Sequence, residues 1–321
     1  MAGKKITELT QANAVTDNDL FIVETANGTC SIPYSEIKKM FQNMLETETN
    51  TGDTKSFPFV DCAASHNGIF RGKDLTNVYT IDEICERISN GTFEDLYIGD
   101  YFDVTISTEY TENEVVRCIL AGFDTYLGTG SGLGAFTNHH AVIVPKNCFN
   151  KIAPMNQTST TTGGFANSYM RKTVLPIYEN ALKSAINNHI IEHKEILANA
   201  VDENLNSNAG AGIKGASSGC VSCYVRLSLL SEIQIYGSNI RSSSFYDTGY
   251  DNLQLPLFAL DPKAKLCGKN TTIDGNGDDN LQWYWLKNVV SVDTFAYTTN
   301  YSYNFDNASY NGGVRPLFCI G

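Results

Sequence analysis

The pattern of apolar and polar positions at the start of the chain predicts a small hairpin followed by a helix. Apolar runs at 21–24 and 30–32 flank Asn27 and Gly28, and Asn-Gly between apolar runs is a strong hairpin signal. The expected helix opens at Tyr34 and repeats apolar residues at helical spacing, namely Ile37, Met40, Phe41 and Met44. This module, residues 1–45, is too small to be stable alone. Its helix must pack against the rest of the chain or against symmetry mates in an oligomer.

Beyond this module the pattern changes twice. Residues 46–57 are polar and nearly free of apolar side chains, which predicts a linker. Residues 58–321 mix short strands with two or three helices and predict one large α+β domain. The elements expected in it are a helix at 81–89 capped by Thr80, strands at 101–107, 115–124 and 141–144, and a longer helix at 176–199.

Composition narrows the class of protein. The chain has 321 residues, of which 42% are hydrophobic, enough for a real core. Only 18% are charged, so surface polarity must come from Asn, Ser, Thr, Gly and Tyr. The net charge of -12, with 23 basic against 35 acidic residues, argues against a nucleic-acid partner, which needs clustered Lys and Arg.

No targeting signal stands at the start of the chain. Met1 is followed by a polar stretch without the apolar core of a signal peptide, and no apolar run approaches the length of a membrane span. We therefore expect synthesis in a bacterial cytoplasm and no membrane insertion. The nine scattered cysteines are then expected to be free and buried.

A polar aromatic stretch near the C-terminus is the candidate binding surface. Residues 293–311 contain four Tyr and four Asn and no Lys or Arg, a composition close to that of antibody paratopes. Tyrosine rings also suit the C–H face of a sugar. The expected ligand-binding residues are Tyr297, Asn300, Tyr301, Tyr303, Asn304, Asp306, Asn307, Tyr310 and Asn311. The alternative is an ordinary half-buried strand, with Phe295 and Phe305 in the core. Residues 236–252 have similar chemistry and are either a neighbouring loop of the same face or simply a long loop.

Other constellations fall short of a chemical site. Residues 274–279 resemble a calcium loop but lack the EF-hand Gly and Glu, so a tight turn is favoured. Cys220 and Cys223 form a lone C-x-x-C, which His189 and His193 complete as a zinc site only if all four meet; two buried thiols are the default. His139 and His140 have no nucleophile motif beside them and are expected to be structural. We therefore expect no enzyme activity, no metal and no cofactor.

Three passages resemble a known family. Residues 1–41 resemble the opening of phage tail-fibre and head-fibre proteins, and residues 65–102 resemble structural proteins of phages of gut Firmicutes. From about 138 to the end the chain resembles a domain family of unknown function from such phages. Its marks are Asn138-His139-His140, Thr162-Gly163-Gly164, Met170-Arg171, residues 229–237, residues 284–287 and residues 312–318.

The C-terminal passage also resembles C-type-lectin-like folds, which include phage tropism adhesins and formylglycine-generating enzymes. The latter use a cysteine pair near the end of the fold; here Cys319 alone follows Cys267, which argues against that activity. Within this ending Trp283, Trp285 and Arg315 are expected to be structural, with the guanidinium bonded to backbone carbonyls or a carboxylate.

The resemblance implies a virion protein. It implies a tail or head fibre or adhesin, with the N-terminal module docked on other virion proteins and the C-terminal domain binding a host surface glycan or protein. A homotrimer is the expected assembly and the virion the expected location. The alternative is a capsid or tail decoration protein with a purely structural role.

Overall fold

The chain divides into two compact units, residues 1–59 and 60–321. The computed structural model describes residues 20–25, 28–39, 61–129, 136–199, 201, 219–243, 245–268, 282–299 and 303–321. The linker predicted at 46–57 lies outside the described residues, as do Met40, Phe41 and Met44 of the first predicted helix.

The first unit carries the predicted hairpin and the start of the predicted helix. Strand β1, Leu20–Thr25, pairs antiparallel with β2, Gly28–Pro33, in a register that places Thr25 opposite Gly28. Residues 34–39 are helical, with Ile37 half-buried. The hairpin and the onset of the helix at Tyr34 are thus confirmed.

A curled antiparallel sheet forms the centre of the second unit. Its order is β3-β4-β5-β13-β6, and β9 pairs with another part of β13. The strands are β3 Tyr101–Ile106, β4 Glu114–Phe123, β5 Ala141–Pro145, β6 Ile190–Ile191, β9 Leu227–Leu229 and β13 Pro316–Ile320. The strands predicted at 101–107, 115–124 and 141–144 are therefore confirmed. Every residue of the C-terminal strand β13 is buried, and the strand lies between β5 on one side and β6 and β9 on the other.

Two smaller antiparallel sheets complete the strands. A three-stranded sheet contains β10 Tyr284–Val289, β11 Thr294–Thr298 and β12 Tyr303–Asn307 in that order. A two-stranded sheet pairs β7, His193–Ala198, with β8, Cys220–Val225. Mixed helices and antiparallel strands of this kind define an α+β fold, as expected.

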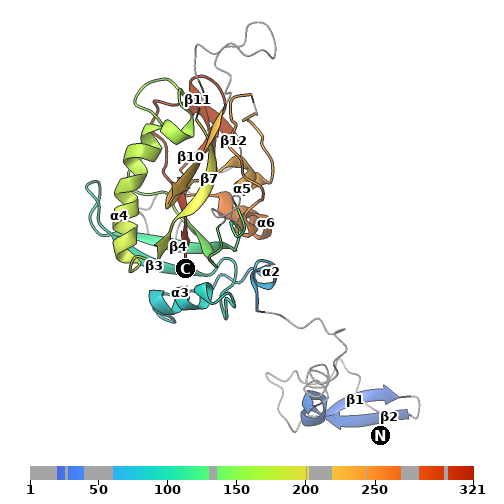
Figure 1. Ribbon diagram of the computed structural model, residues 1–321. Helices are drawn as coiled ribbons and strands as arrows, with labels where there is room; N and C mark the ends of the chain where they lie inside the picture. The colour runs from blue at the N-terminus through green and yellow to red at the C-terminus, as the bar shows by residue number, and fades with distance from the viewer. Residues whose placement is uncertain are drawn as a thin grey trace. The chain divides into compact units, whose positions relative to one another are not determined.

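Short helices cover the sheets. They are α2 Ala63–His66, α3 Ile81–Ser89, α4 Leu175–Ala185, α5 Glu232–Tyr236 and α6 Pro256–Leu260, together with the turns of helix η3 Phe165–Asn167, η4 Met170–Val174 and η5 Pro262–Lys265. In Figure 1, α4 runs along one side of this unit, where it packs against β3 and β9. Helix α3 lies at the end of the unit away from β11 and β12.

The structure of helix α3 explains why its sequence pattern predicted a helix. The Thr80 hydroxyl accepts a hydrogen bond from the backbone N–H of Glu83, and the Glu83 carboxylate accepts one from the backbone N–H of Thr80. This capping box fixes the start of the helix. Ile84, Cys85 and Ile88 form its buried face, as their spacing predicts.

The prediction of one long helix at 176–199 is wrong for its second half. Helix α4 ends at Ala185, and Asn187 and Asn188 have positive φ angles of 51° and 66°. Asparagine is one of the few residues that tolerates this region, in which a helix cannot continue. The apolar positions that follow belong to strands β6 and β7 instead.

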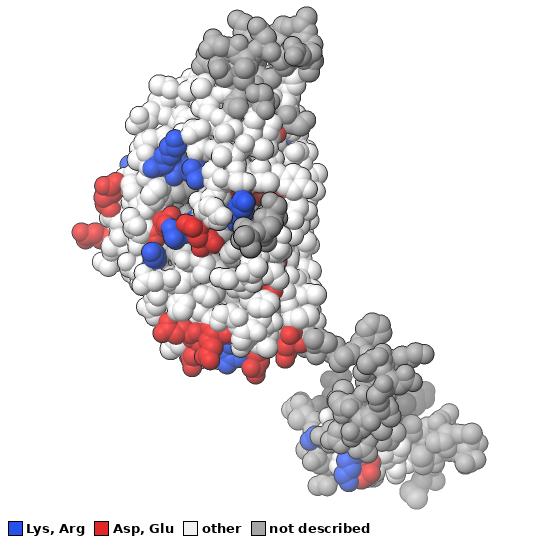
Figure 2. All heavy atoms as spheres, in the orientation of Figure 1, with Lys and Arg blue, Asp and Glu red and all other residues white. Residues whose placement is uncertain are grey.

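Charged residues gather unevenly on the second unit. Figure 2 shows a face that is largely uncharged, with acidic side chains collected at the end that carries α3. Helix α3 contributes exposed Asp82, Glu83 and Glu86 to that end. Among the helices of the described ranges, none combines the length and the apolar character needed to cross a bilayer.

Candidate functional site

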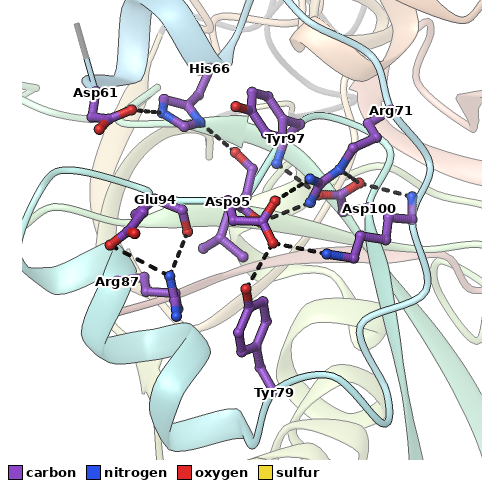
Figure 3. Close-up of polar contacts among 11 residues, drawn as sticks. Asp61, His66, Arg71, Tyr79, Arg87, Glu94, Asp95, Tyr97 and Asp100 are labelled. Carbon is purple, nitrogen blue, oxygen red and sulfur yellow. Dashed lines mark hydrogen bonds and ion pairs between the residues drawn. The ribbon is translucent and has the colours of Figure 1, made fainter. Parts of the chain in front are cut away.

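An ion-pair network joins the two ends of the passage at 65–102. Arg71 pairs with the buried carboxylate of Asp100, with Nη2 2.6 Å from Oδ2 and Nε 3.0 Å from Oδ1, and it also pairs with Asp95 (Figure 3). The Asp95 carboxylate further accepts from Lys73 Nζ at 2.8 Å and from the Tyr79 hydroxyl at 2.7 Å. Burial acts to raise the pKa of Asp95, but these donors hold that pKa well below its usual range.

The network is a structural clamp. It ties the segment around Arg71 to the segment around Asp100, whose carboxylate also accepts the backbone N–H groups of Lys73 and Tyr97. Gly99 has a φ of 85°, and a Cβ there would lie 2.3 Å from the Phe70 ring, so this close approach requires glycine. The charged groups of Arg71, Lys73, Asp95 and Asp100 thus pair with one another.

The predicted binding stretch forms the edge of the three-stranded sheet. In β11 and β12, Thr298 lies opposite Tyr303, Tyr297 opposite Asn304, and Ala296 opposite Phe305. Directly opposed residues point to the same face of a sheet. Tyr303 and Phe305 therefore share one face of β12, while Asn304 and Asp306 share the other with Tyr297.

The first face is an exposed aromatic patch. Tyr303 is 38% and Phe305 42% exposed, and the Arg241 guanidinium lies 5.5 Å and 5.6 Å from the centres of their rings. Tyr236 packs edge-on against Tyr303, with ring centres 5.6 Å apart. We call Tyr236, Arg241, Tyr303 and Phe305 the β12 surface. It brings residues of the segment 236–252 beside β12, which identifies part of that segment as a neighbouring loop of the same face.

Phe305 corrects one expectation. Its alternation with Tyr303 places both rings on the outward face, so Phe305 is not in the core, whereas Phe295 is fully buried. The alternation of residues along 301–305 correctly predicted a strand. It did not predict which face of that edge strand is covered, because that depends on the elements packed against it.

The other predicted binding residues divide into exposed and packed positions. Tyr310 is 58% exposed and Asn311 is exposed, whereas Asn304 and Asp306 are half-buried. Tyr297 packs on Trp283, with ring centres 4.7 Å apart, and Asn307 bonds Ser159 and Ser309. Asn300 and Tyr301 lie outside the described residues. The structure thus groups Tyr303 with Phe305 and separates Tyr297 from them.

Of the residues expected to be structural, Trp285 and Arg315 are buried and Trp283 is half-buried against the core. Trp285 is fully buried, and its Nε1 donates to the Ala153 carbonyl at 3.0 Å, while Trp283 packs edge-on against it. A Cβ at Gly312 would lie 2.3 Å from the Trp283 ring, so this glycine permits the chain to pass over the tryptophans. Within the described part of the chain, these contacts anchor β10 to the segment before β13.

Arg315 is almost completely buried. Its Nε donates to the Pro145 carbonyl at 2.8 Å, and its Nη1 donates to the Ala264 carbonyl at 2.9 Å and to the Tyr284 hydroxyl at 3.0 Å. The guanidinium therefore fastens three separate segments to the start of β13. The thiols of Cys148 and Cys267 lie close by, with their sulfur atoms 2.7 Å apart.

The metal and histidine candidates separate in space. Residues 274–279 lie outside the described residues, and the described ranges contain no cluster of three or more metal-ligating side chains. His189 bonds Asp82, and His193 bonds Glu195; since 193–198 is a strand, the two histidines are not one helical turn apart. Cys220 is exposed and Cys62 and Cys223 are half-buried, which corrects the expectation that the cysteines are buried.

His139 and His140 are held by hydrogen bonds. His139 Nδ1 lies 2.8 Å from Asp124 Oδ2. His140 is fully buried, and its Nε2 accepts from the Tyr126 backbone N–H at 3.1 Å. Burial lowers the pKa of His140 to about 4, which keeps its ring neutral and able to accept that bond.

A buried charged cluster was not predicted from the sequence. Glu195 Oε1 lies 3.0 Å from His193 Nε2, and Glu195 Oε2 accepts from the Ser228 hydroxyl at 2.7 Å and from Lys287 Nζ at 3.2 Å. Lys287 also pairs with Asp251 at 3.1 Å. One signal was available: Lys287 interrupts an apolar strand, β10, in which every residue is buried. A lysine there requires buried acidic partners.

The cluster shifts the pKa values of its members in the directions that ion pairs produce. Burial alone would lower the pKa of His193, but the Cys319 thiol and the Glu195 carboxylate beside it raise that pKa to about 10. Burial alone would raise the pKa of Glu195, but Lys287 and His193 lower it to about 2. His193 is thus held protonated and Glu195 ionised at neutral pH.

Stability should therefore depend on pH in a defined window. Because the pKa of His193 is raised in the folded protein, its stabilising contribution is complete below about pH 6.5 and is lost as the pH rises toward 10. We expect the free energy of unfolding to fall from pH 7 to 9 with a contribution of up to about 1.4 kcal/mol per pH unit. Urea titrations at several pH values measure this slope.

The matched control for this experiment is His193→Gln, which cannot titrate. Its free energy of unfolding should fall less steeply over the same range, while cysteines and tyrosines away from His193 contribute equally to both proteins. Equal slopes for the two proteins would show that His193 is neutral in the folded state.

Comparisons with protein-family models, with curated proteins and with solved structures found no match to this chain.

Proposed function

We propose that the chain is a bacteriophage virion protein, a tail or head fibre or adhesin, that binds a host surface glycan or protein through the β12 surface. The observation that carries the proposal is the exposure of Tyr303 and Phe305 beside Arg241. Aromatic residues and arginine dominate the energetic centres of protein interfaces. Tyrosine supplies contact area with few torsions to freeze.

The arrangement of the chain supports the same role. The resemblance of residues 1–41 to fibre openings supports docking of the first unit on other virion proteins. The chain divides into two compact units, and we propose that the second unit is the one displayed. We propose a homotrimer and a C-type-lectin-like arrangement of the second unit, in which the three-stranded sheet before the C-terminal strand carries the ligand. Repeated weak sites on one particle then gain strength through avidity.

The second candidate is a decoration protein of the capsid or tail. The position of β12 favours it, because within the described residues β12 is bonded on one side only, to β11. An exposed edge strand with apolar side chains is also suited to packing against another protein. In that case Tyr303 and Phe305 would be covered in the assembled particle.

Substitution of the two exposed rings separates the candidates. We expect the double variant Tyr303→Ala and Phe305→Ala to bind gut Firmicutes cells at least about tenfold more weakly, a loss of about 1.4 kcal/mol, because interface aromatics carry most of the binding energy. Flow cytometry with fluorescently labelled full-length protein measures this binding. The melting temperature should change little, since both rings are partly exposed.

The matched control is Tyr224→Ala, which removes a tyrosine that is 59% exposed on β8. It should bind cells like the original protein. Undiminished binding by the double variant would reject the β12 surface as the site. If the original protein bound none of a broad panel of cells, and labelling of intact particles located it in a closed lattice, the decoration role would stand.

A further inference from the structure

A second concave site lies away from the β12 surface. A half-open cavity of about 490 Å³ is bounded by the turn after β4, by the β7–β8 hairpin and by residues 250–252. Small-molecule sites usually have volumes of roughly 300–1,000 Å³. Tyr250 is placed by a backbone hydrogen bond from its N–H to the Ile196 carbonyl of β7, at 2.9 Å. The cavity wall is therefore set by strand pairing as well as by side chains.

Two acidic residues of the buried charged cluster belong to the wall of this cavity. Glu195 and Asp251 both line the cavity, and Lys287 pairs with each of them. Hydrogen bonds to His193, Ser228 and Lys287 occupy both oxygens of Glu195. Asp251 accepts from Lys287 through Oδ1, which fixes this carboxylate in the cavity wall. Buried ionic groups of this kind are costly to fold and concentrate at functional sites.

The rim of the cavity supplies complementary chemistry. The Tyr250 ring is 65% exposed and forms an apolar platform at the mouth. Ser222 and Asn252 also line the cavity, and within the described ranges their side chains make no hydrogen bond. A hydroxyl and an amide each donate and accept. The cavity is thus lined by an aromatic ring, a carboxylate and two neutral polar side chains.

This combination selects one class of ligand. A phosphate group would face two carboxylates, Glu195 and Asp251, against one lining cation, Lys194. A purely apolar molecule would leave Asp251 and Asn252 without partners. A cation would compete with Lys287, which already pairs with both carboxylates, and with His193, which pairs with Glu195. A sugar ring presents an apolar C–H face to Tyr250 and hydroxyls to Asp251, Asn252 and Ser222.

We propose that this cavity binds a pyranose sugar, as a site separate from the β12 surface. The proposal does not require the virion role, since it follows from the cavity alone. Millimolar affinity is expected for a single sugar, because the site is half-open and few hydroxyls are engaged at once.

Saturation-transfer NMR on the full-length protein tests the proposal. The probes are free N-acetylglucosamine, N-acetylgalactosamine, glucose, galactose and rhamnose. We expect at least one to receive saturation, and its dissociation constant to rise at least about fivefold in Tyr250→Ala and in Asn252→Ala. Melting temperatures close to that of the original protein show that both variants are folded.

The control is Leu260→Ala, which trims an exposed side chain at the end of α6, outside both the cavity and the β12 surface, and should leave sugar binding unchanged. Tyr303→Ala is measured beside it, as the variant of the β12 surface. Absence of saturation for all five sugars would overturn the proposal, and so would sugar binding that survives both cavity substitutions. Loss of sugar binding in Tyr303→Ala alone would move the sugar to the β12 surface. Cell binding that depends on Tyr303 and Phe305 is a separate measurement, so either proposal can fail without the other.

Discussion

Replacing Lys287 by methionine is expected to lower the free energy of unfolding by about 3–5 kcal/mol, among the largest effects of any single substitution in this protein. The side chain is nearly fully buried and is the shared counter-ion of Glu195 and Asp251. Methionine fills a similar volume but leaves two carboxylates inside the protein with less compensation. Urea denaturation at pH 7 measures the loss.

A second substitution isolates the electrostatic cause. In the double variant Lys287→Met and Glu195→Gln, one of the orphaned charges is removed, so the loss should be smaller than the sum of the two single losses. The matched surface control is Lys263→Met, since Lys263 is exposed and should change stability little. Additive losses in the double variant would contradict direct coupling between Lys287 and Glu195.

Replacing Arg315 by alanine is expected to cost a similar amount, about 3–5 kcal/mol. The substitution removes hydrogen bonds to the Pro145 and Ala264 carbonyls and to the Tyr284 hydroxyl, and it leaves a cavity where the guanidinium stood. Because these groups fasten separate segments to β13, the loss should appear as a lower melting temperature of the whole second unit. Calorimetry measures it.

Lysine at position 315 provides the sharper comparison. It retains the charge, but a single ammonium lacks the planar fork of donors that reaches three partners in different directions. Arg315→Lys should therefore recover only a small part of the stability. Full recovery in Arg315→Lys would show that charge alone matters and that the three hydrogen bonds do not.

Local signals in the sequence predicted the elements that depend on neighbouring residues. The capping box of Thr80 and Glu83 and the apolar spacing of Ile84 and Ile88 identified α3, and alternating apolar positions identified β3 and β4. These signals work because a cap or a buried face is determined within a few residues of chain. The Asn-Gly hairpin of the first unit belongs to the same group.

The error after Ala185 shows where local signals become ambiguous. Ile186 and Ile190 fit helical spacing, yet His193, Glu195 and Leu197 are buried at every second position, which is the period of a strand. Over so short a stretch both periods can be matched. Pairing of β6 with β13 and of β7 with β8 decided the outcome, and those partners lie far along the chain.

By itself, the sequence determined the α+β class, several helices and strands, and a tyrosine- and asparagine-rich stretch that includes two exposed rings on β12. Tertiary structure alone decided that Phe305 faces outward, that Arg241 lies beside it, and that Lys287 meets Glu195 from 92 residues away in the chain. The physical reason is that periodicity fixes which residues share a face, whereas burial and charge pairing depend on which distant segment covers that face.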